Sequence, residues 1–188
     1  MRGGSPEAQQ FILKMRYRRI LIPGGTYFFT IVTHSRIPVF SSSRSVDLLR
    51  NVFRQVKERH PFVIDAIVIL PDHIHCVLTM PDEDLDYPLR IGLIKSDFAR
   101  RFALAGPKGK ADTNPVWQRR YWEHLMRNEN DYTKHVEYIH YNPVKHGLVK
   151  SPKDWPWSSF NDYVAKGVYD VNWGAGEVIN FEAEVGAE

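Results

Sequence analysis

Cysteine and long apolar runs are the two features that the chain has least of. Its 188 residues include one cysteine, Cys76, which excludes an internal disulfide framework and suits a reducing compartment. No stretch approaches the roughly 20 apolar residues that cross a bilayer. The first ten residues also lack the apolar core of a secretory signal. We therefore expect a cytoplasmic protein without a membrane partner.

Positive charge is missing from the C-terminal end. No Lys or Arg follows Lys166, whereas the acidic residues beyond it are Asp170, Glu177, Glu182, Glu184 and Glu188. Residues 1–166 thus carry 25 basic and 17 acidic side chains and a formal charge of +8, against +3 for the whole chain. A basic body suggests a polyanionic partner, although a solvated surface beside a loose terminus shows the same pattern.

The composition is otherwise that of one soluble domain. Hydrophobic residues make up 43% of the chain and charged residues 25%, which suits a globular protein with a hydrophobic core of its own. The sequence predicts a flexible leader over residues 1–14, a single domain over 15–166 and an acidic tail over 167–188.

Hydrophobic periodicity predicts an alternation of strands and helices. Runs rich in β-branched and aromatic residues predict strands at 24–33, 62–70, 73–80 and 116–124. Apolar residues at helical spacing predict helices at 45–59, 89–104 and 128–142, the last of which we expect Pro143 to end. The order β-α-β-β-α-β-α indicates an α+β fold, with a mainly antiparallel sheet and helices packed on one face.

The segment "ILPDHIHCVLTMP" (69–81) places two histidines one residue apart inside an apolar run. Because side chains alternate along a strand, His73 and His75 are expected on one face of the sheet, with Ile74 and Cys76 on the other. A pair of this kind can also be two hydrogen-bonded histidines that hold no ligand, so the spacing by itself is a weak signal.

The predicted helix 128–142 carries a second set of polar residues. Tyr132, Val136 and Ile139 form its apolar stripe. Tyr138 and Asn142 share another face four residues apart, so that one side chain lies a turn above the other. The plain alternatives are a half-buried surface tyrosine and an asparagine that merely precedes a proline.

Together these residues form a chemically coherent site. Two imidazoles and an amide oxygen make a mixed ligand set with open positions, which suits Mg²⁺ or Mn²⁺ acting on a phosphate. A phenol opposite that metal, from Tyr138, can attack phosphorus in line and form a covalent phosphotyrosine. Lys134 or His135 would then support the phenolic proton or the phosphate.

Four segments, in this order and spacing, resemble the REP-associated tyrosine transposases: "LPDHIH", "WQRRYWEH", "YIHYNPVKHGLV" and "DWPWSSF". That family consists of domesticated relatives of the single-tyrosine HUH transposases of IS200-type insertion sequences, and the resemblance covers about residues 15–175. Under this resemblance, His73-Ile74-His75 matches the HUH motif and Tyr138 matches the nucleophile. Asn142 matches the third metal ligand, where the mobile-element relatives have Gln.

The resemblance implies an RRM-like or ferredoxin-like core, known as the HUH endonuclease fold. It also implies an HUH-type nuclease and transposase that needs Mg²⁺ or Mn²⁺. Such an enzyme cuts and rejoins single-stranded DNA at palindromic repeats that form imperfect hairpins, through a covalent 5′-phosphotyrosine. It would act as a monomer or homodimer at the bacterial nucleoid.

A DNA partner requires a basic surface with aromatic rings for stacking. The candidates are Arg16, Arg18, Arg19, Lys95, Arg100, Arg101, Trp117, Arg119 and Arg120. The acidic tail is a tethered competitor for such a surface, and its aromatic residues can take the place of bases, so we expect it to inhibit. A disordered or merely packed terminus is the alternative.

Two other classes of function stay open at this point. A histidine-triad nucleotide hydrolase needs a third alternating histidine, but Val77 occupies that position. A non-catalytic nucleic-acid-binding module on an RRM-like sheet would place stacking aromatic residues on the face where this chain has His73 and His75.

Overall fold

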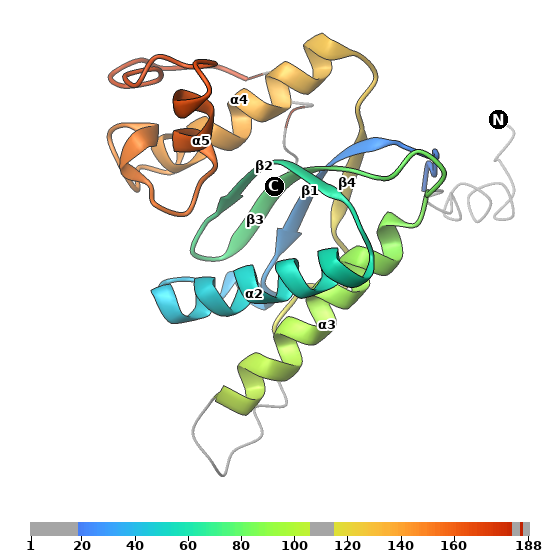
Figure 1. Ribbon diagram of the computed structural model, residues 1–188. Helices are drawn as coiled ribbons and strands as arrows, with labels where there is room; N and C mark the ends of the chain where they lie inside the picture. Colours follow the sequence, from blue (N-terminus) through green and yellow to red (C-terminus); the bar gives the residue numbers. More distant parts are fainter. Residues whose placement is uncertain (1–18, 106–114, 182–184, 186–188) are drawn as a thin grey trace, which may run out of the picture.

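A four-stranded antiparallel sheet lies at the centre of the molecule, in the order β2-β3-β1-β4 (Figure 1). The computed structural model describes residues 19–105, 115–181 and 185, so the predicted leader 1–14 lies outside the described residues. The strands are β1 (Thr26–Val32), β2 (Val63–Ile69), β3 (His73–Thr79) and β4 (Trp122–Leu125).

The predicted helices are present in the predicted order. They are α2 (Ser43–Arg59), α3 (Tyr87–Ala105) and α4 (Glu129–Lys145), followed by the short α5 (Phe160–Ala165) and accompanied by two 3₁₀ turns, η1 (His34–Arg36) and η2 (Pro152–Asp154). The predicted fourth strand was too long, because Trp117 forms only an isolated bridge with Thr33 before β4 begins at Trp122. None of the helices within the described ranges has the length and apolar character needed to cross a membrane.

One face of the sheet is covered by α2 and α3. Alternation along β1 and β3 turns Phe29, Ile31, Ile74 and Cys76 toward these helices, which contribute Leu49, Phe53, Ile94 and Phe98 to the same core. All eight side chains are at least 97% buried. This side contains the larger of the two cores.

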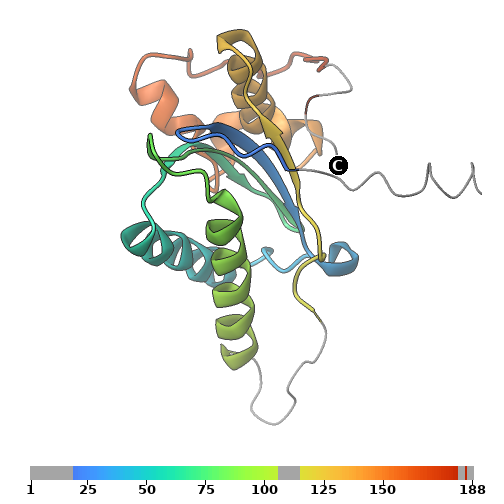
Figure 2. The ribbon, with the colours of Figure 1, turned by 90° about the vertical axis from the view of Figure 1, so that its right-hand side faces the viewer.

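The opposite face is covered by α4, so the α+β fold is confirmed but its helices do not all lie on one side. Figures 1 and 2 show α2 and α3 below the sheet and α4 above it. The reason is that Phe28 and Val68, which point away from α2, are also apolar and fully buried, and they pack against Val136 and Ile139 of α4. The strands β1 and β3 are thereby buried on both faces.

The segment after η2 covers the free edge of β2. The Ile69 amide donates to the Trp157 carbonyl over 2.9 Å, and the Ser159 amide donates to the Ile67 carbonyl over 2.9 Å. The Trp155 indole adds a hydrogen bond to the Ile69 carbonyl over 3.0 Å. These hydrogen bonds satisfy backbone groups at the edge of β2, which could otherwise pair with a strand of another chain.

Candidate metal and nucleophile site

The two histidines of β3 lie next to each other on the face covered by α4. Their ring centroids are 4.8 Å apart with the planes at 81°, and both side chains are almost completely buried. The antiparallel register places His75 between Val68 and Thr30, in the interior of the sheet. A strand that is paired on both sides holds its side chains rigidly, which is what a ligand pair requires.

Hydrogen bonds fix the orientation of both rings. His73 Nδ1 lies 2.6 Å from Asp72 Oδ1, and His75 Nδ1 lies 3.0 Å from Thr30 Oγ1. Burial raises the pKa of the Asp72 carboxyl, but its bonds with His73 and Arg36 outweigh burial and leave the pKa below its ordinary value. An ionised carboxylate only accepts, so His73 carries its proton on Nδ1 and presents a lone pair at Nε2, as in metal-ligating histidines.

Asn142 lies on α4 between two residues whose rings contact this histidine pair. It lies one turn after Tyr138, whose ring contacts His75 at 5.3 Å, and one turn before His146, whose ring contacts His73 at 5.2 Å. The Asn142 side chain is fully buried, and neither its oxygen nor its nitrogen has a hydrogen-bond partner among the described residues.

An unpaired buried amide costs about 1–3 kcal/mol of stability. A cation bound to Asn142 Oδ1 would satisfy the oxygen, and two imidazoles with one amide oxygen form a donor set that accepts a divalent ion. The residues present therefore fit a metal ion.

The hydroxyl of Tyr138 is bound by a lysine that the sequence analysis did not select. Lys145 Nζ donates to the Tyr138 oxygen over 3.0 Å, and the ammonium also lies 4.7 Å from the centre of the ring. His135, proposed for this role, instead bonds through Nδ1 to the Asp131 carbonyl at 2.8 Å. The ammonium of Lys145 stabilises negative charge on the phenolic oxygen.

The path of α4 explains why Lys145 reaches Tyr138. Asn128 caps the helix by accepting from the Asp131 amide over 2.9 Å. The prediction that Pro143 ends this helix is wrong, because α4 continues to Lys145 and the His146 amide then bonds to the Asn142 carbonyl. A proline removes one intrahelical hydrogen bond, but the His146 bond shows that the backbone of α4 stays helical past Pro143. Lys145 and His146 had a signal in the sequence, since they follow Tyr138 and Asn142 at seven and four residues.

The C-terminal segment covers the tyrosine from the other side. The Phe181 ring lies edge-on to Tyr138 at 5.3 Å, and Val185 is buried in the same core. Tyr141 anchors this segment by donating to the Glu177 carbonyl over 2.6 Å. Tyr138, only 1% exposed, is thus covered partly by the predicted acidic tail.

The basic residues predicted to bind DNA divide into several places. Arg16 and Arg18 lie outside the described residues. Arg19, Lys95 and Arg119 line one groove of about 460 Å³ between α3 and the segment that leads into β4. Arg19 lies over the Tyr121 ring at 4.9 Å, which leaves an aromatic ring and cations together.

Other members of the predicted set have structural partners. Trp117 is buried between Phe40 and Phe98 and donates to the Lys95 carbonyl over 3.0 Å, so its ring belongs to the core. Lys95 donates to the Gln118 carbonyl over 2.8 Å. The remaining arginines stay apart from that groove: Arg100 pairs with Asp97, Arg101 with Gln55, and Arg120 is exposed.

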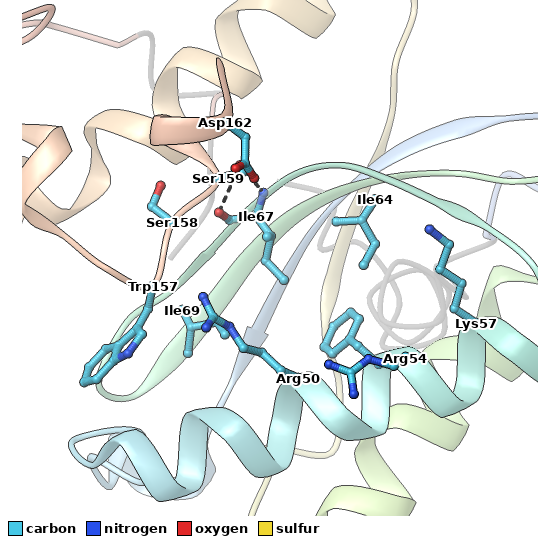
Figure 3. A pocket seen from close by; sticks show the side chains of 11 residues that line it. Arg50, Arg54, Lys57, Ile64, Ile67, Ile69, Trp157, Ser158, Ser159 and Asp162 are labelled. Carbon is cyan, nitrogen blue, oxygen red and sulfur yellow. Dashed lines mark hydrogen bonds between the residues drawn. The ribbon is translucent and has the colours of Figure 1, made fainter. Parts of the chain in front are cut away.

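A second basic groove was not predicted. Arg50, Arg54 and Lys57 follow one face of α2 and line a hollow of about 300 Å³ beside Trp157 (Figure 3). Their spacing of four and three residues places them on one face of a helix, which the sequence shows. From the sequence we predicted only an amphipathic helix there, and not a basic groove.

Comparison with known proteins shows the family of this chain. Residues 23–142 match the family model described as "Transposase IS200 like". A REP-associated tyrosine transposase of Escherichia coli K12 is 42% identical over 89% of this chain and 94% of its own length. A Haemophilus influenzae protein assigned to the same group is 38% identical over 90% of this chain and 98% of its own length. A solved REP-associated tyrosine transposase bound to a REP hairpin superimposes with a TM-score of 0.77 and 43% identity, over 89% of this chain and 95% of that one.

The chain therefore belongs to the IS200-like transposases, in the group of the REP-associated tyrosine transposases. Transposases of this family are enzymes that cleave and rejoin DNA, and they generally depend on a divalent metal ion.

Proposed function

We propose that this protein cleaves and rejoins single-stranded DNA at palindromic repeats that form imperfect hairpins, with Tyr138 as the nucleophile. One observation carries the proposal: the fully buried amide of Asn142, which has no hydrogen-bond partner among the described residues, lies on α4 between Tyr138 and His146, whose rings contact His75 and His73. A similar protein was solved bound to a REP hairpin, which supports the substrate. Such an enzyme acts where genomic DNA lies, at the nucleoid.

The chemistry assigned to Tyr138 is a balanced exchange of ester bonds. The phenol releases its proton and its oxygen bonds to phosphorus, the bond from phosphorus to the 3′-oxygen breaks, and that oxygen leaves as a 3′-hydroxyl by taking up a proton, so one proton is released and one is consumed. The DNA stays attached through a 5′-phosphotyrosine, and attack by a 3′-hydroxyl on this ester rejoins a strand. Lys145, 3.0 Å from the phenolic oxygen, stabilises the charge that develops there.

His73, His75 and Asn142 would hold Mg²⁺ or Mn²⁺. When bound, the ion polarises the scissile phosphate and neutralises part of its charge. The protein contributes the orientation: Asp72 fixes the proton of His73 on Nδ1, and Thr30 holds the ring of His75.

The test is a denaturing gel of the protein incubated with a labelled single-stranded REP-type hairpin and Mn²⁺. We expect a covalent protein–DNA adduct with the unaltered chain and none with Tyr138→Phe, although Tyr138→Phe still binds the hairpin in a gel-shift assay. Tyr141→Phe is the matched control, and it should form the adduct. Cleavage by Tyr138→Phe, or its loss in Tyr141→Phe alone, would show that the nucleophile is misassigned.

The same assay tests the ligands. His73→Ala and His75→Ala should each abolish metal-dependent cleavage, because two protein ligands hold the ion too weakly. Asn142→Ala should retain some activity, since water can replace a neutral amide oxygen. Full activity of a His73→Ala, His75→Ala double variant would contradict the metal role. Hairpin binding without any adduct in the unaltered chain would instead favour a non-catalytic binding module.

A further inference from the structure

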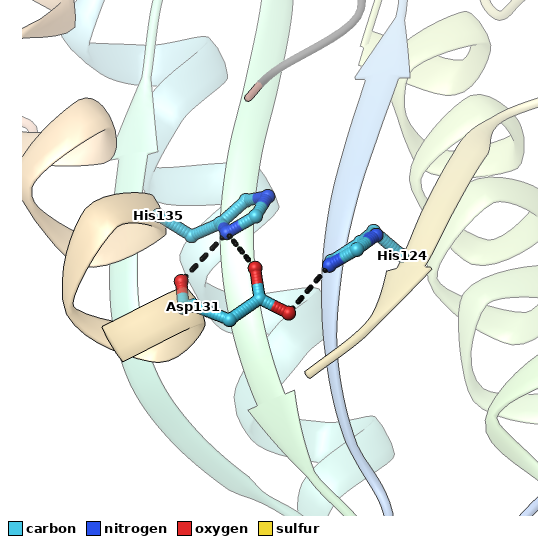
Figure 4. Close-up of side chains that lie close together, drawn as sticks. All are labelled: His124, Asp131 and His135. Carbon is cyan, nitrogen blue, oxygen red and sulfur yellow. Dashed lines mark hydrogen bonds and ion pairs between the residues drawn. The ribbon is translucent and has the colours of Figure 1, made fainter. Parts of the chain in front are cut away.

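Three further metal-ligand side chains converge at the opposite end of α4. They are His124 on β4 with Asp131 and His135 on α4, and one ligand atom from each lies within 4.8 Å of the other two (Figure 4). His124 Nε2 is 2.8 Å from Asp131 Oδ2, and His135 Nδ1 is 3.2 Å from Asp131 Oδ1. We propose that this cluster is a second cation site, which takes a transition metal such as Zn²⁺.

The ligand atoms already have nearly the spacing that zinc requires. Zinc bonds of about 2.0–2.2 Å in tetrahedral geometry place neighbouring ligand atoms roughly 3.4 Å apart. The separations of 2.8 and 3.2 Å involve different oxygens of Asp131, and one ligand atom of each residue lies within 4.8 Å of the other two, so modest shifts of the side chains would bring three ligand atoms to this spacing. Two imidazoles and one carboxylate favour Zn²⁺ over the oxygen-seeking Mg²⁺, and three protein ligands leave one position for water.

The side chains are held in place by their surroundings. The His124 and His135 rings are stacked, with centroids 4.7 Å apart and planes at 15°. Trp122 stacks on the other side of His124, and Phe28 packs against His135 at 4.9 Å. The Arg127 amide donates to Asp131 Oδ2 over 3.0 Å. Ordering these ligands therefore requires little further loss of conformational freedom when a cation binds.

The protonation states also suit a metal. Burial lowers the pKa of His135, so this imidazole is neutral at neutral pH. Burial raises the pKa of Asp131, but hydrogen bonds from His124 and the Arg127 amide outweigh it and leave the pKa below its ordinary value. A neutral imidazole and an ionised carboxylate are the forms that bind metal ions.

Binding requires the His135 proton to move from Nδ1 to Nε2. The Nδ1 bond to the Asp131 carbonyl is lost. At Nε2 no bond is broken, but this buried nitrogen has no acceptor among the described residues, so the bonds to the metal ion must outweigh the cost of an unpaired N–H. His124 and Asp131 are 17% and 18% exposed, so a cation can enter from solvent.

The site is separate from the one that Tyr138 faces. The two sites use different ligands, and the Phe28 ring contacts both, with its centroid 5.4 Å from that of His75 and 4.9 Å from that of His135. A cation here would join β4 to α4 through Asp131 and His135, which lie about two turns and one turn before Tyr138. Its expected effect is to stiffen the helix that carries Tyr138.

The experiment uses the full chain with His73→Ala and His75→Ala, so that the first site cannot contribute. We expect equilibrium dialysis against Zn²⁺ to give one bound ion, Co²⁺ to give the intense visible absorption of tetrahedral coordination, and Zn²⁺ to raise the Tm. Adding His124→Ala should abolish all three, and Asp131→Asn, which keeps the shape of the side chain, should weaken binding at least tenfold.

His34→Ala in the same background is the matched control, since His34 lies on η1, outside both sites, and it should bind one ion. Circular dichroism without metal establishes that each variant is folded. Absence of Zn²⁺ binding in the double variant, or binding that survives both His124→Ala and Asp131→Asn, would overturn the proposal.

Discussion

Tyr138 and Lys145 lie two helical turns apart on α4, and the ammonium of Lys145 donates a hydrogen bond to the phenolic oxygen over 3.0 Å. The phenol is buried, so a charge that develops on its oxygen is poorly screened by water. Under the proposed mechanism, the lysine therefore acts mainly on the transition state, in which the oxygen gives up its proton and bonds to phosphorus.

We expect Lys145→Met to lower the rate of adduct formation by about 10²-fold, the usual effect of removing one preorganised donor. Single-turnover cleavage of the hairpin measures the rate, and a gel shift measures affinity, which should change little. Lys150→Met removes an exposed lysine five residues further on and serves as the control. Equal rates in the two variants would contradict a role for Lys145 in the chemical step.

His140 shows a different use of a histidine on the same helix. It is fully buried, with Nε2 2.9 Å from Ser159 Oγ and Nδ1 3.3 Å from the Tyr169 hydroxyl. Burial lowers the pKa of His140 to about 3. An unfolded histidine has a pKa of about 6.5, so between these values the unfolded chain binds a proton that the folded chain does not.

The free energy of unfolding should therefore fall as the pH falls from about 6.5 towards 3, by an amount on the order of a few kcal/mol from His140 alone. Above this window both states hold a neutral ring and the contribution is constant. Urea unfolding across the window measures the slope. His140→Gln should flatten it, whereas His34→Gln should keep it. An unchanged slope in His140→Gln would mean that His140 accepts protons while folded.

At the scale of one element, α4 carries residues of both proposed metal sites and the proposed nucleophile. Asn128 caps its first turn, and the Asp131 amide that it binds belongs to the residue that also bonds His124 and His135. Loss of this cap would thus affect both the helix and the His124–Asp131–His135 cluster.

We expect Asn128→Ala to lower the free energy of unfolding by about 1 kcal/mol, the usual cost of losing a side-chain cap. Asn130→Ala changes an exposed asparagine two residues later, and it should lie within a few tenths of a kcal/mol of the unaltered chain. Denaturant unfolding measures both. If the two variants lost equal stability, the loss would come from helix propensity or surface effects and not from the cap.

At the scale of the whole molecule, the segment that follows the basic body reaches Tyr138 through Phe181. Residues 1–166 carry a formal charge of +8, and the segment beyond them carries five acidic side chains and no basic one. Phe181 lies on Tyr138, while Trp173 stacks on Tyr169 at 4.7 Å and belongs to the packing around α5. The part of the tail that covers Tyr138, the proposed nucleophile, thus begins near Phe181.

We propose that this cover inhibits the enzyme, and we expect deletion of residues 181–188 to raise the rate of cleavage or the affinity for the hairpin. The effect should be larger at low salt, where the acidic side chains are less screened. Phe181→Ala should show a smaller increase, and Val178→Ala, which changes an 86% exposed side chain, should show none. A well-folded truncation with equal or lower activity at every salt concentration would contradict inhibition by the tail.

Several features of this protein follow from the sequence alone, because they depend on geometry within one strand or helix. The order of strands and helices follows from hydrophobic periodicity. Alternation along a strand places His73 and His75 on one face, and the helical repeat pairs Tyr138 with Asn142. Each of these relations joins residues within a few positions of one another, so the chain determines them before it folds.

Other features were decided only by packing between distant segments. Local patterns did not show that α4 would cover the second face of the sheet, that Phe181 would lie on Tyr138, or that His124 would meet Asp131 and His135. Lys145 reached Tyr138 only because α4 continued past Pro143. The physical reason is that the hydrophobic effect favours burial of the whole apolar face of the sheet. Phe28 and Val68 belong to that face, and packing of α4 on the sheet removes them from water. The tertiary structure therefore decided which polar groups meet: His124 with Asp131 and His135, and Lys145 with Tyr138.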